Sequence, residues 1–357
     1  MNFFSNVFSG SRLRQLILMC GTLAFGTLWA QNPAGMKPFD IIPHPQDSAI
    51  EILMDGKIFT IYRYSQKQEK PVLYPIISPH GKTITRGYPL DPRPGERVDH
   101  PHQLGLWFNY GDVNGLDFWN NSSAIPPEEL KHYGKIFHDD YSIMTDQDEG
   151  PLLKVHCTWK DHDGQALLYE FTTFRFLQIR DAYIIDRITT LEALQEVSFE
   201  DNKEGVLGIR VARELEIPSD KPDHFTDTHG KVTEVKVLDN SKVNGDYLSS
   251  EGLTGDNVWG TRGRWVRLSG KVDAMPVSVT IIDHPGNVGY PTYWHARGYG
   301  LFAANPLGQA IFSNGKESLH FKLNKGESTT FRYRIVVQDG SEMTPQHIEQ
   351  LVKDFTN

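Results

Sequence analysis

The chain has 357 residues, and its 45 acidic residues outnumber its 36 Lys and Arg, which gives a formal net charge of −9. This balance argues against nucleic acid or anionic lipid as a partner, because both attract basic surfaces, and it favours a neutral or cationic small ligand. A chain of this length can bury a large core, either as one large domain or as two smaller ones.

The first 30 residues have the pattern of a secretory signal peptide. Arg12 and Arg14 precede an apolar run over residues 16–28, and Ala30 stands before a polar segment. This run is too short to cross a bilayer comfortably, which takes about 20 residues, and no later run is long and apolar enough. We therefore expect Sec-type export to the periplasm or the medium, and no integral membrane segment in the mature chain.

Cys20 lies inside the apolar run and raises the alternative of a lipoprotein anchor. Met19 stands where a lipoprotein cleavage site requires a small residue, so anchoring is the less favoured interpretation. Cleavage after Ala30 would leave 327 residues (357 − 30) with Cys157 as the one cysteine, so no intramolecular disulfide could form. The mature charge would be −11, since two arginines are lost (−9 − 2).

Strand patterns dominate the rest of the chain. Residues 50–64 alternate around Asp55-Gly56, the dipeptide that a tight hairpin turn requires for its positive φ angles. Residues 151–191 are typical of a meander of long antiparallel strands, rich in β-branched and aromatic residues. Further strand-like runs cover residues 206–217, 264–269, 277–282, 299–304, 309–313, 319–323 and 329–337.

The C-terminus has the signals of a helix. Thr344 is a suitable N-cap, Pro345 suits the first helical position, and apolar residues follow at helical spacing. No internal repeat or linker divides the chain. We therefore predict a single all-β domain over residues 31–357, mainly antiparallel, with the architecture of a large β-sandwich and a C-terminal helix. The loops 86–150 and 218–262 are long enough to carry function or local structure.

Residues 97–119 form the first segment that is dense in ionisable and aromatic side chains. His100 and His102 are two apart, so in an extended strand both would face one side, where they could bind a metal or supply acid and base groups. The alternative for each residue alone is a structural role such as capping a turn. The density of these groups favours a site. Candidate ligand-binding residues in the segment are Trp107, Asp112, Asn114, Asp117 and Trp119.

Residues 283–297 form a second segment with the same ingredients, including His284, Trp294, His295 and Arg297. Aromatic faces stack on sugar rings or cations, while His and Arg bind hydroxyl or carboxylate oxygens. A polyhydroxylated ligand fits this inventory. The alternative is that Trp294 is a core residue and that Arg297 pairs with a structural acid.

Glu204 and Arg210 lie between the two segments, where an acidic turn leads into an apolar strand. Glu204 is the candidate general base, because it opens a strand in an otherwise buried sheet. The alternative is a solvated surface carboxylate. Arg210 is a further candidate for contact with a substrate.

Histidines and carboxylates in this number could also bind a divalent metal. The candidate ligands are His100, His102, His284 and His295. No HExxH helix or CxxC pair is present, so the sequence leaves metal binding and the identity of any metal open. No nucleotide cofactor is expected, because there is no GxxxxGK[ST] loop and no GxGxxG after a strand. A GxSxG nucleophile elbow is also absent from the sequence.

Four stretches of the sequence resemble the domain-of-unknown-function family often labelled methane oxygenase PmoA. These stretches are residues 99–119, 204–212, 259–270 and 283–308, and the resemblance spans nearly the whole mature chain. Gln103 stands where the family usually has a second His, which weakens a metal cluster centred on His102. True subunits of particulate methane monooxygenase are membrane-bound, whereas no transmembrane helix is expected here after the signal, so the label does not describe the function.

The resemblance implies an exported β protein of bacteria that degrade glycans, and the long strands look like the galactose-mutarotase-like supersandwich, a likeness of architecture alone. We therefore expect a carbohydrate-active protein that binds a sugar or glycoside against Trp107, Trp119 or Trp294 and transforms it by hydrolysis, elimination or epimerisation. The alternatives are a non-catalytic glycan-binding protein and a metal-dependent oxygenase. The expected catalytic residues are His100, His102, Glu204, His284 and His295.

Overall fold

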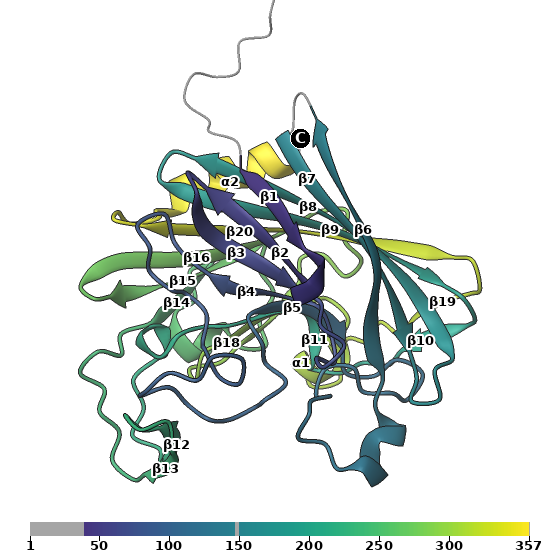
Figure 1. Cartoon of the computed structure of the whole chain (residues 1–357), viewed down its shortest axis with the longest axis horizontal. Helices are drawn as coiled ribbons and strands as arrows, with labels where there is room; N and C mark the ends of the chain where they lie inside the picture. Colours follow the sequence, from purple (N-terminus) through teal and green to yellow (C-terminus); the bar gives the residue numbers. More distant parts are fainter. Residues whose placement is uncertain (1–38, 147–149, 357) are drawn as a thin grey trace, which may run out of the picture. The chain divides into compact units, whose positions relative to one another are not determined.

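The computed structural model describes residues 39–146 and 150–356, and the signal peptide predicted over residues 1–30 lies outside them. Within the described ranges, two eight-stranded sheets contain most of the strands (Figure 1). The first sheet has the order β1 (Asp40–His44), β2 (Ala49–Met54), β3 (Lys57–Arg63), β4 (Val72–Ile76), β5 (Leu106–Tyr110), β11 (Gly205–Arg210), β18 (Leu301–Asn305) and β17 (Tyr293–Ala296). The second has the order β14 (Asp246–Ser249), β15 (Trp265–Val272), β16 (Met275–Asp283), β20 (Ser328–Asp339), β9 (Ala182–Ala193), β8 (Ala166–Ile179), β7 (Gly150–Lys160) and β6 (Lys135–Asp146).

Shorter elements connect and flank these sheets. Two small antiparallel pairs join β10 (Val197–Phe199) to β19 (Phe321–Leu323) and β12 (Asp223–Thr226) to β13 (Val232–Val235). Single helical turns are η1 (Pro45–Asp47), η2 (Pro127–His132), η3 (Arg213–Leu215) and η4 (Gly255–Val258), and the α-helices are α1 (Gln309–Phe312) and α2 (Pro345–Thr356). No described helix has the length and apolar character that a membrane span requires.

The main core lies between the two sheets. Phe59 and Phe108 of the first sheet meet Phe176 and Phe331 of the second, with ring centroids 6.4 and 5.6 Å apart respectively. Both sheets contribute buried residues to one continuous apolar cluster. The predicted all-β antiparallel sandwich is therefore confirmed.

Helix α2 covers the outer face of the second sheet. Its buried Ile348 and Leu351 pack in a separate apolar cluster with Ile184 and Val336 from the outer side of that sheet. Figure 1 shows this helix, in yellow, beside the strands of the second sheet. The helix begins as predicted, because Thr344 caps it.

Several predicted elements are also confirmed, and two are corrected. The hairpin around Asp55 forms between β2 and β3, and the meander forms β7, β8 and β9. Residues 309–313, predicted as a strand, contain the helix α1 instead. The strand predicted over 206–217 ends at Arg210, and η3 follows it. The two segments predicted as long loops also contain strands of the main sheets, β5 and β6 in residues 86–150 and β14 in residues 218–262, so they are loops only in part.

A third apolar cluster lies on the outer face of the first sheet, the face turned away from the second sheet. It contains Trp107, Trp119, Leu104, Leu301 and Ala303. Strands β5, β11 and β18 are consequently buried on both faces. The sequence segments that are rich in His, Asp and Arg lie around this third cluster.

Candidate functional site

Strand register brings the two predicted segments onto one face of the first sheet. Gly208 of β11 is paired with Trp107 of β5 and with Ala303 of β18, and Ala303 is paired with His295 of β17. Residues in one such row point to the same side of a sheet. Arg210 lies two residues beyond Gly208, so it points to this side as well. We call the polar residues gathered here the outer-face cluster: Lys70, Arg86, Asp99, His100, His102, Gln103, Asp117, Lys203, Glu204, Arg210, His295, Arg297 and Tyr299.

Two buried arginines that share one carboxylate form the base of the cluster. Arg86 and Arg210 both donate to Oδ1 of Asp99, Arg210 at 2.7 Å, and Arg210 also donates to the side chain of Gln103. Burial alone would raise the pKa of Asp99, but the hydrogen bond from His100 and the two guanidinium charges hold it well below its usual range. Burial, followed by the charge of Arg210, lowers the pKa of Arg86 to about 10.

His100 is the most accessible histidine of the cluster. Its backbone has a φ of 44°, its Nδ1–H donates to Oδ2 of Asp99 at 2.8 Å, and its side chain is 41% exposed. The ring stacks on Tyr299 with centroids 5.1 Å apart and planes within 2°. Tyr299 also contacts Arg210, whose guanidinium carbon lies 4.8 Å from the ring centroid. The first segment is thereby joined to the end of the second.

His102 is buried beside His100, with ring centroids 5.6 Å apart. Burial, then the charge of Lys70, lowers the pKa of His102 to about 2, so this imidazole is neutral. Lys70 is buried as well, and its Nζ donates to the carbonyl oxygens of His102 at 2.8 Å and Trp119 at 3.4 Å. Sequence reasoning missed Lys70, because a lysine before a proline in a polar loop is typical of a solvated turn.

His295 and Glu204 form a second group, and the charge of Glu204 acts on Tyr299. Nδ1–H of His295 donates to the carbonyl oxygen of Lys203 at 3.0 Å, and Oε2 of Glu204 lies 3.8 Å from the same nitrogen. Nε2 of His295 accepts from Nε–H of Arg297 at 3.2 Å. Both ring nitrogens are thus engaged. Burial, then the charges of Arg297 and Lys203, lowers the pKa of His295 to about 3.

Asp117 lies near this group. Its two oxygens accept from the backbone and side-chain nitrogens of Asn120 at 2.8 and 2.7 Å. Burial is the largest cause of its raised pKa, and the negative charge of Glu204 adds to it. Asp117 therefore shapes a turn while contributing charge to the outer-face cluster.

The tryptophans expected to stack on a sugar are not accessible. Trp107 and Trp119 are fully buried with ring centroids 5.0 Å apart, and both pack over Gly208, where a Cβ would lie 2.6 Å from the Trp107 ring. Trp294 points to the opposite face of β17 from His295, because neighbouring strand residues alternate. It lies in the main core and donates to the carbonyl oxygen of Gly263 at 3.1 Å.

Trp259, which the sequence reasoning did not single out, contacts the cluster instead. The guanidinium carbon of Arg297 lies 4.5 Å from its ring centroid. The residue follows η4 inside one of the long predicted loops. Its position in a stretch that carries the family resemblance was the available signal.

Asp112 and Asn114 have structural roles in the turn after β5. Asp112 accepts from the backbone nitrogen of Gly115 at 2.9 Å. Asn114, at a φ of 55°, donates to the carbonyl oxygen of Glu196 and accepts from the backbone nitrogen of Ser198. Neither side chain is brought to the outer-face cluster.

His284 also lies apart from the other predicted histidines. Its ring packs edge-on against Phe355 of α2, with centroids 5.2 Å apart, and its Nδ1 accepts from the backbone nitrogen of Gly286 at 2.9 Å. It follows β16, a strand of the second sheet. Across residues 39–146 and 150–356, no three His, Cys, Asp or Glu side chains are arranged to hold a metal ion. The four candidate histidines do not form a ligand set.

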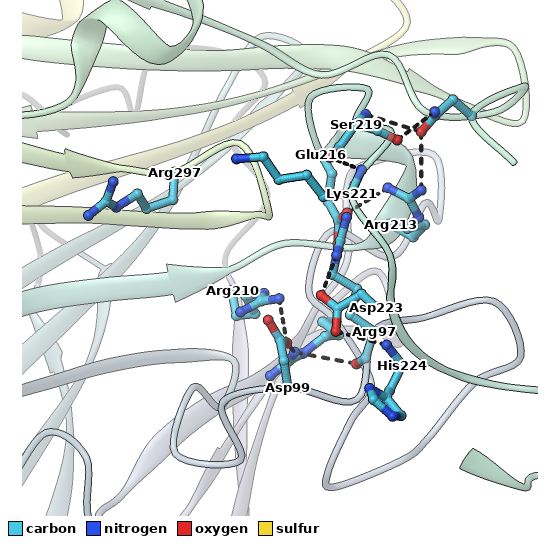
Figure 2. Close-up of polar contacts among 12 residues, drawn as sticks. Arg97, Asp99, Arg210, Arg213, Glu216, Ser219, Lys221, Asp223, His224 and Arg297 are labelled. Atoms are coloured by element: carbon cyan, nitrogen blue, oxygen red, sulfur yellow. Dashed lines mark hydrogen bonds and ion pairs between the residues drawn. The ribbon is translucent and has the colours of Figure 1, made fainter. Parts of the chain in front are cut away.

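A cavity of about 790 Å³ lies beside the hairpin of β12 and β13. Its lining includes Arg93, Glu96, Arg213, Phe225 and Lys242, and none of the predicted site residues. Figure 2 shows an ion-pair network in which Arg97 pairs with Glu216 and Asp223.

Comparisons with solved structures give weak similarities. The galactosidase domain of the alpha-galactosidase-sucrose kinase AgaSK is 11% identical, with a TM-score of 0.39, over 84% of this chain and 41% of that one. The alpha-galactosidase AgaB from Geobacillus stearothermophilus is 10% identical, with a TM-score of 0.38, over 84% and 41%. The chain thus spans about two fifths of these galactosidases. A galactose mutarotase related enzyme from Lactobacillus acidophilus is 8% identical, with a TM-score of 0.32, over 86% and 99%.

TM-scores this low carry no inference about this chain, and no curated protein matches its sequence. A family match is extensive. Residues 49–353 match a family described as a family of unknown function (DUF6807). The expected resemblance to a domain-of-unknown-function family is confirmed, while the methane-oxygenase label has no support in the match. Because the match covers most of the chain, this protein belongs to the family of unknown function DUF6807.

Proposed function

We propose that this protein is an exported, carbohydrate-active enzyme that binds a sugar or glycoside at the outer-face cluster. One observation carries the proposal. Residues 99–103, Glu204, Arg210 and 295–299 are distant in the sequence, and their polar side chains meet on one face of one sheet. Sugars need several fixed donors and acceptors in a small space, together with a ring face.

His100 is the candidate for proton transfer. Asp99 accepts from its Nδ1–H and so fixes the tautomer, which leaves Nε2 of a partly exposed ring for a ligand. His102 and His295 are suited to a different role, because both are buried and have pKa values far below neutrality. We assign them to hydrogen bonding and positioning.

Glu204 is the candidate partner of His100. Its carboxylate is 14% exposed, it pairs with Lys203, and its charge acts on Tyr299, whose ring stacks on His100. Hydrolysis, elimination and epimerisation of a glycoside all require one group that gives a proton and one that takes it. We propose His100 and Glu204 for these two roles.

The test is turnover and affinity measured on the same variants. We expect His100→Gln and Glu204→Gln to reduce kcat by about 100-fold or more on any glycoside that the wild type converts, since general acid–base groups contribute about 10²–10⁴, with the dissociation constant changed little. His347→Gln, at an exposed position of α2, is the control. Unchanged turnover in both site variants would refute the assignment.

A non-catalytic glycan-binding protein is the second candidate. One observation favours it: both ring nitrogens of His295 are engaged and His102 is buried, so most of the imidazole groups are committed to structure. A wild type that binds sugars without converting any of them, and binds equally well as His100→Gln, would support this candidate over the enzyme.

A further inference from the structure

Arg297 differs from the other arginines around the cluster. Arg86 and Arg210 share Asp99, and Arg97 and Arg213 share Glu216. Within the described ranges, no carboxylate lies within ion-pair distance of Arg297. Figure 2 shows it apart from the network of dashed contacts that joins the other arginines to their acids.

Neutral groups hold Arg297 in place. Its Nε–H donates to Nε2 of His295 at 3.2 Å, and its guanidinium lies over the Trp259 ring at 4.5 Å. His295 is itself fixed by its bond to the carbonyl oxygen of Lys203. These contacts use one N–H of the guanidinium and leave its two terminal NH₂ groups without an acceptor among the described residues. A partly exposed guanidinium edge in this state is suited to a bidentate bond with a carboxylate or another oxyanion.

The charge of the outer-face cluster agrees with this. Its cations, apart from Lys70 whose pKa is lowered to about 7, are Arg86, Lys203, Arg210 and Arg297, and its carboxylates are Asp99, Asp117 and Glu204. Four against three leaves a local excess of +1, with the imidazoles taken as neutral, in a chain whose formal charge is −9. A local positive field in an acidic protein attracts an anion to one place.

The buried polar atoms that lack hydrogen-bond partners also favour an anionic ligand. Around the cluster the donors are Nε of Arg86 and Arg210 and the indole nitrogens of Trp107, Trp119 and Trp259, and the acceptors are Oδ1 of Asn109 and Oε1 of Glu216. Donors outnumber acceptors among these atoms. A site with surplus donors and surplus positive charge is completed by a ligand that supplies acceptors.

From these contacts we infer that the ligand is an anionic sugar whose carboxylate or sulfate group binds Arg297. The inference rests on the proposed function and narrows its substrate class. It also reverses the expectation of a neutral or cationic ligand that the net charge suggested. In this arrangement His295 is a positioning residue, because it acts through Arg297.

The experiment is a calorimetric titration of the full chain with D-glucuronate, D-galacturonate, glucose 6-sulfate, D-glucose and D-galactose at low and high salt. We expect an anionic sugar to bind more tightly than its neutral counterpart, and added salt to weaken it. Arg297→Gln should weaken that binding at least about tenfold, and Arg297→Lys by less, because it keeps the charge and loses the fork. Arg180→Gln, on the exposed turn after β8, is the control.

The outcomes separate the two proposals. Preference for uronates assigns the anion as a carboxylate, and preference for glucose 6-sulfate assigns it as a sulfate. Neutral hexoses that bind as tightly as the anionic ones, or a folded Arg297→Gln with unchanged affinity, overturn the inference and leave the proposed function standing. A wild type that binds none of these sugars counts against both. Thermal unfolding of each variant shows whether it is folded.

Discussion

Lys70 is the residue at which burial and charge conflict most directly. It is almost fully buried and bonded to two carbonyl oxygens, and burial lowers its pKa from 10.5 to about 7, the charges of Asp117 and Glu69 opposing the shift. Its contacts tie the chain before β4 to the segments that carry His102 and Trp119. Because the buried charge carries an energetic penalty, the stability of the fold should depend on the protonation of Lys70.

Between pH 7 and 10.5 the unfolded chain binds a proton at Lys70 that the folded chain has lost. The free energy of unfolding should therefore rise with pH in this window, by up to about 1.4 kcal/mol per pH unit. We expect Lys70→Met to lack this increase relative to the wild type, as measured by urea unfolding across the window. Lys154→Met, at an exposed position of β7, is the control and should keep it. Parallel pH profiles for wild type and Lys70→Met would contradict the shift.

Residue identity alone predicted part of the candidate site. One face of the first sheet gathers His100, His102, Glu204, His295 and the two predicted arginines. The signal in the sequence was the density of polar residues, because a buried sheet rarely contains a single isolated polar side chain. The tryptophans and His284 could not be assigned in this way. Which face a side chain takes depends on strand register, and one position separates Trp294 in the core from His295 in the cluster.

At the scale of elements, two of the missed strands, β5 and β17, share one property. Hydrophobic alternation identifies a strand with one solvated face. Strands β5 and β17 are buried on both faces, so Leu106–Tyr110 and Tyr293–Ala296 show no alternation. The hairpin around Asp55 and the meander were predictable because their turns and long patterned strands specify them locally. The loop segments that cover the first sheet had no such local signal.

Strand β11 supports the cluster through a glycine. A Cβ at Gly208 would lie 2.6 Å from the Trp107 ring and 2.9 Å from the Trp119 ring. We expect Gly208→Ala to displace this pair and to lower the free energy of unfolding by about 1–3 kcal/mol, the range for overpacking. The measurement is urea unfolding together with tryptophan fluorescence. Gly286→Ala, whose nearest atom is the edge of the His284 ring at 3.2 Å, is the comparison. A native emission spectrum and unchanged stability in Gly208→Ala would show that the pair is loosely packed.

At the scale of the whole molecule, the inferred anionic ligand is the opposite of what the net charge suggests. The formal charge of −9 averages over a surface on which most acids are far from the cluster. The ion pairs formed on folding determine the net charge at the cluster. Arg86 and Arg210 are neutralised only in part, since both share Asp99. The local field depends on which side chains folding brings together, and composition does not contain that information.

The space between the two sheets also contains a charged pair. Arg187 donates to Glu170 at 2.6 Å and lies between the rings of Phe108 and Phe174, 4.9 and 5.1 Å from their centroids. Trp159 donates to the other oxygen of Glu170 at 2.9 Å. Both charged side chains are nearly inaccessible, at 4% and 7% exposure. Such a pair is stable only as a pair, because each charge compensates the desolvation of the other.

The double variant at Glu170 and Arg187 should therefore have a higher free energy of unfolding than the single variant Glu170→Leu. Glu170→Leu leaves the Arg187 charge uncompensated between the sheets, and we expect it to lower the free energy of unfolding by about 3–5 kcal/mol. Adding Arg187→Met removes that charge and replaces it with an apolar side chain of similar length, so the double variant should be more stable than Glu170→Leu alone. Urea unfolding of the wild type, both single variants and the double variant gives the coupling energy between the two positions. Additive losses would mean that water reaches Arg187 in the single variant, and that the two sheets separate more easily than their continuous apolar core implies.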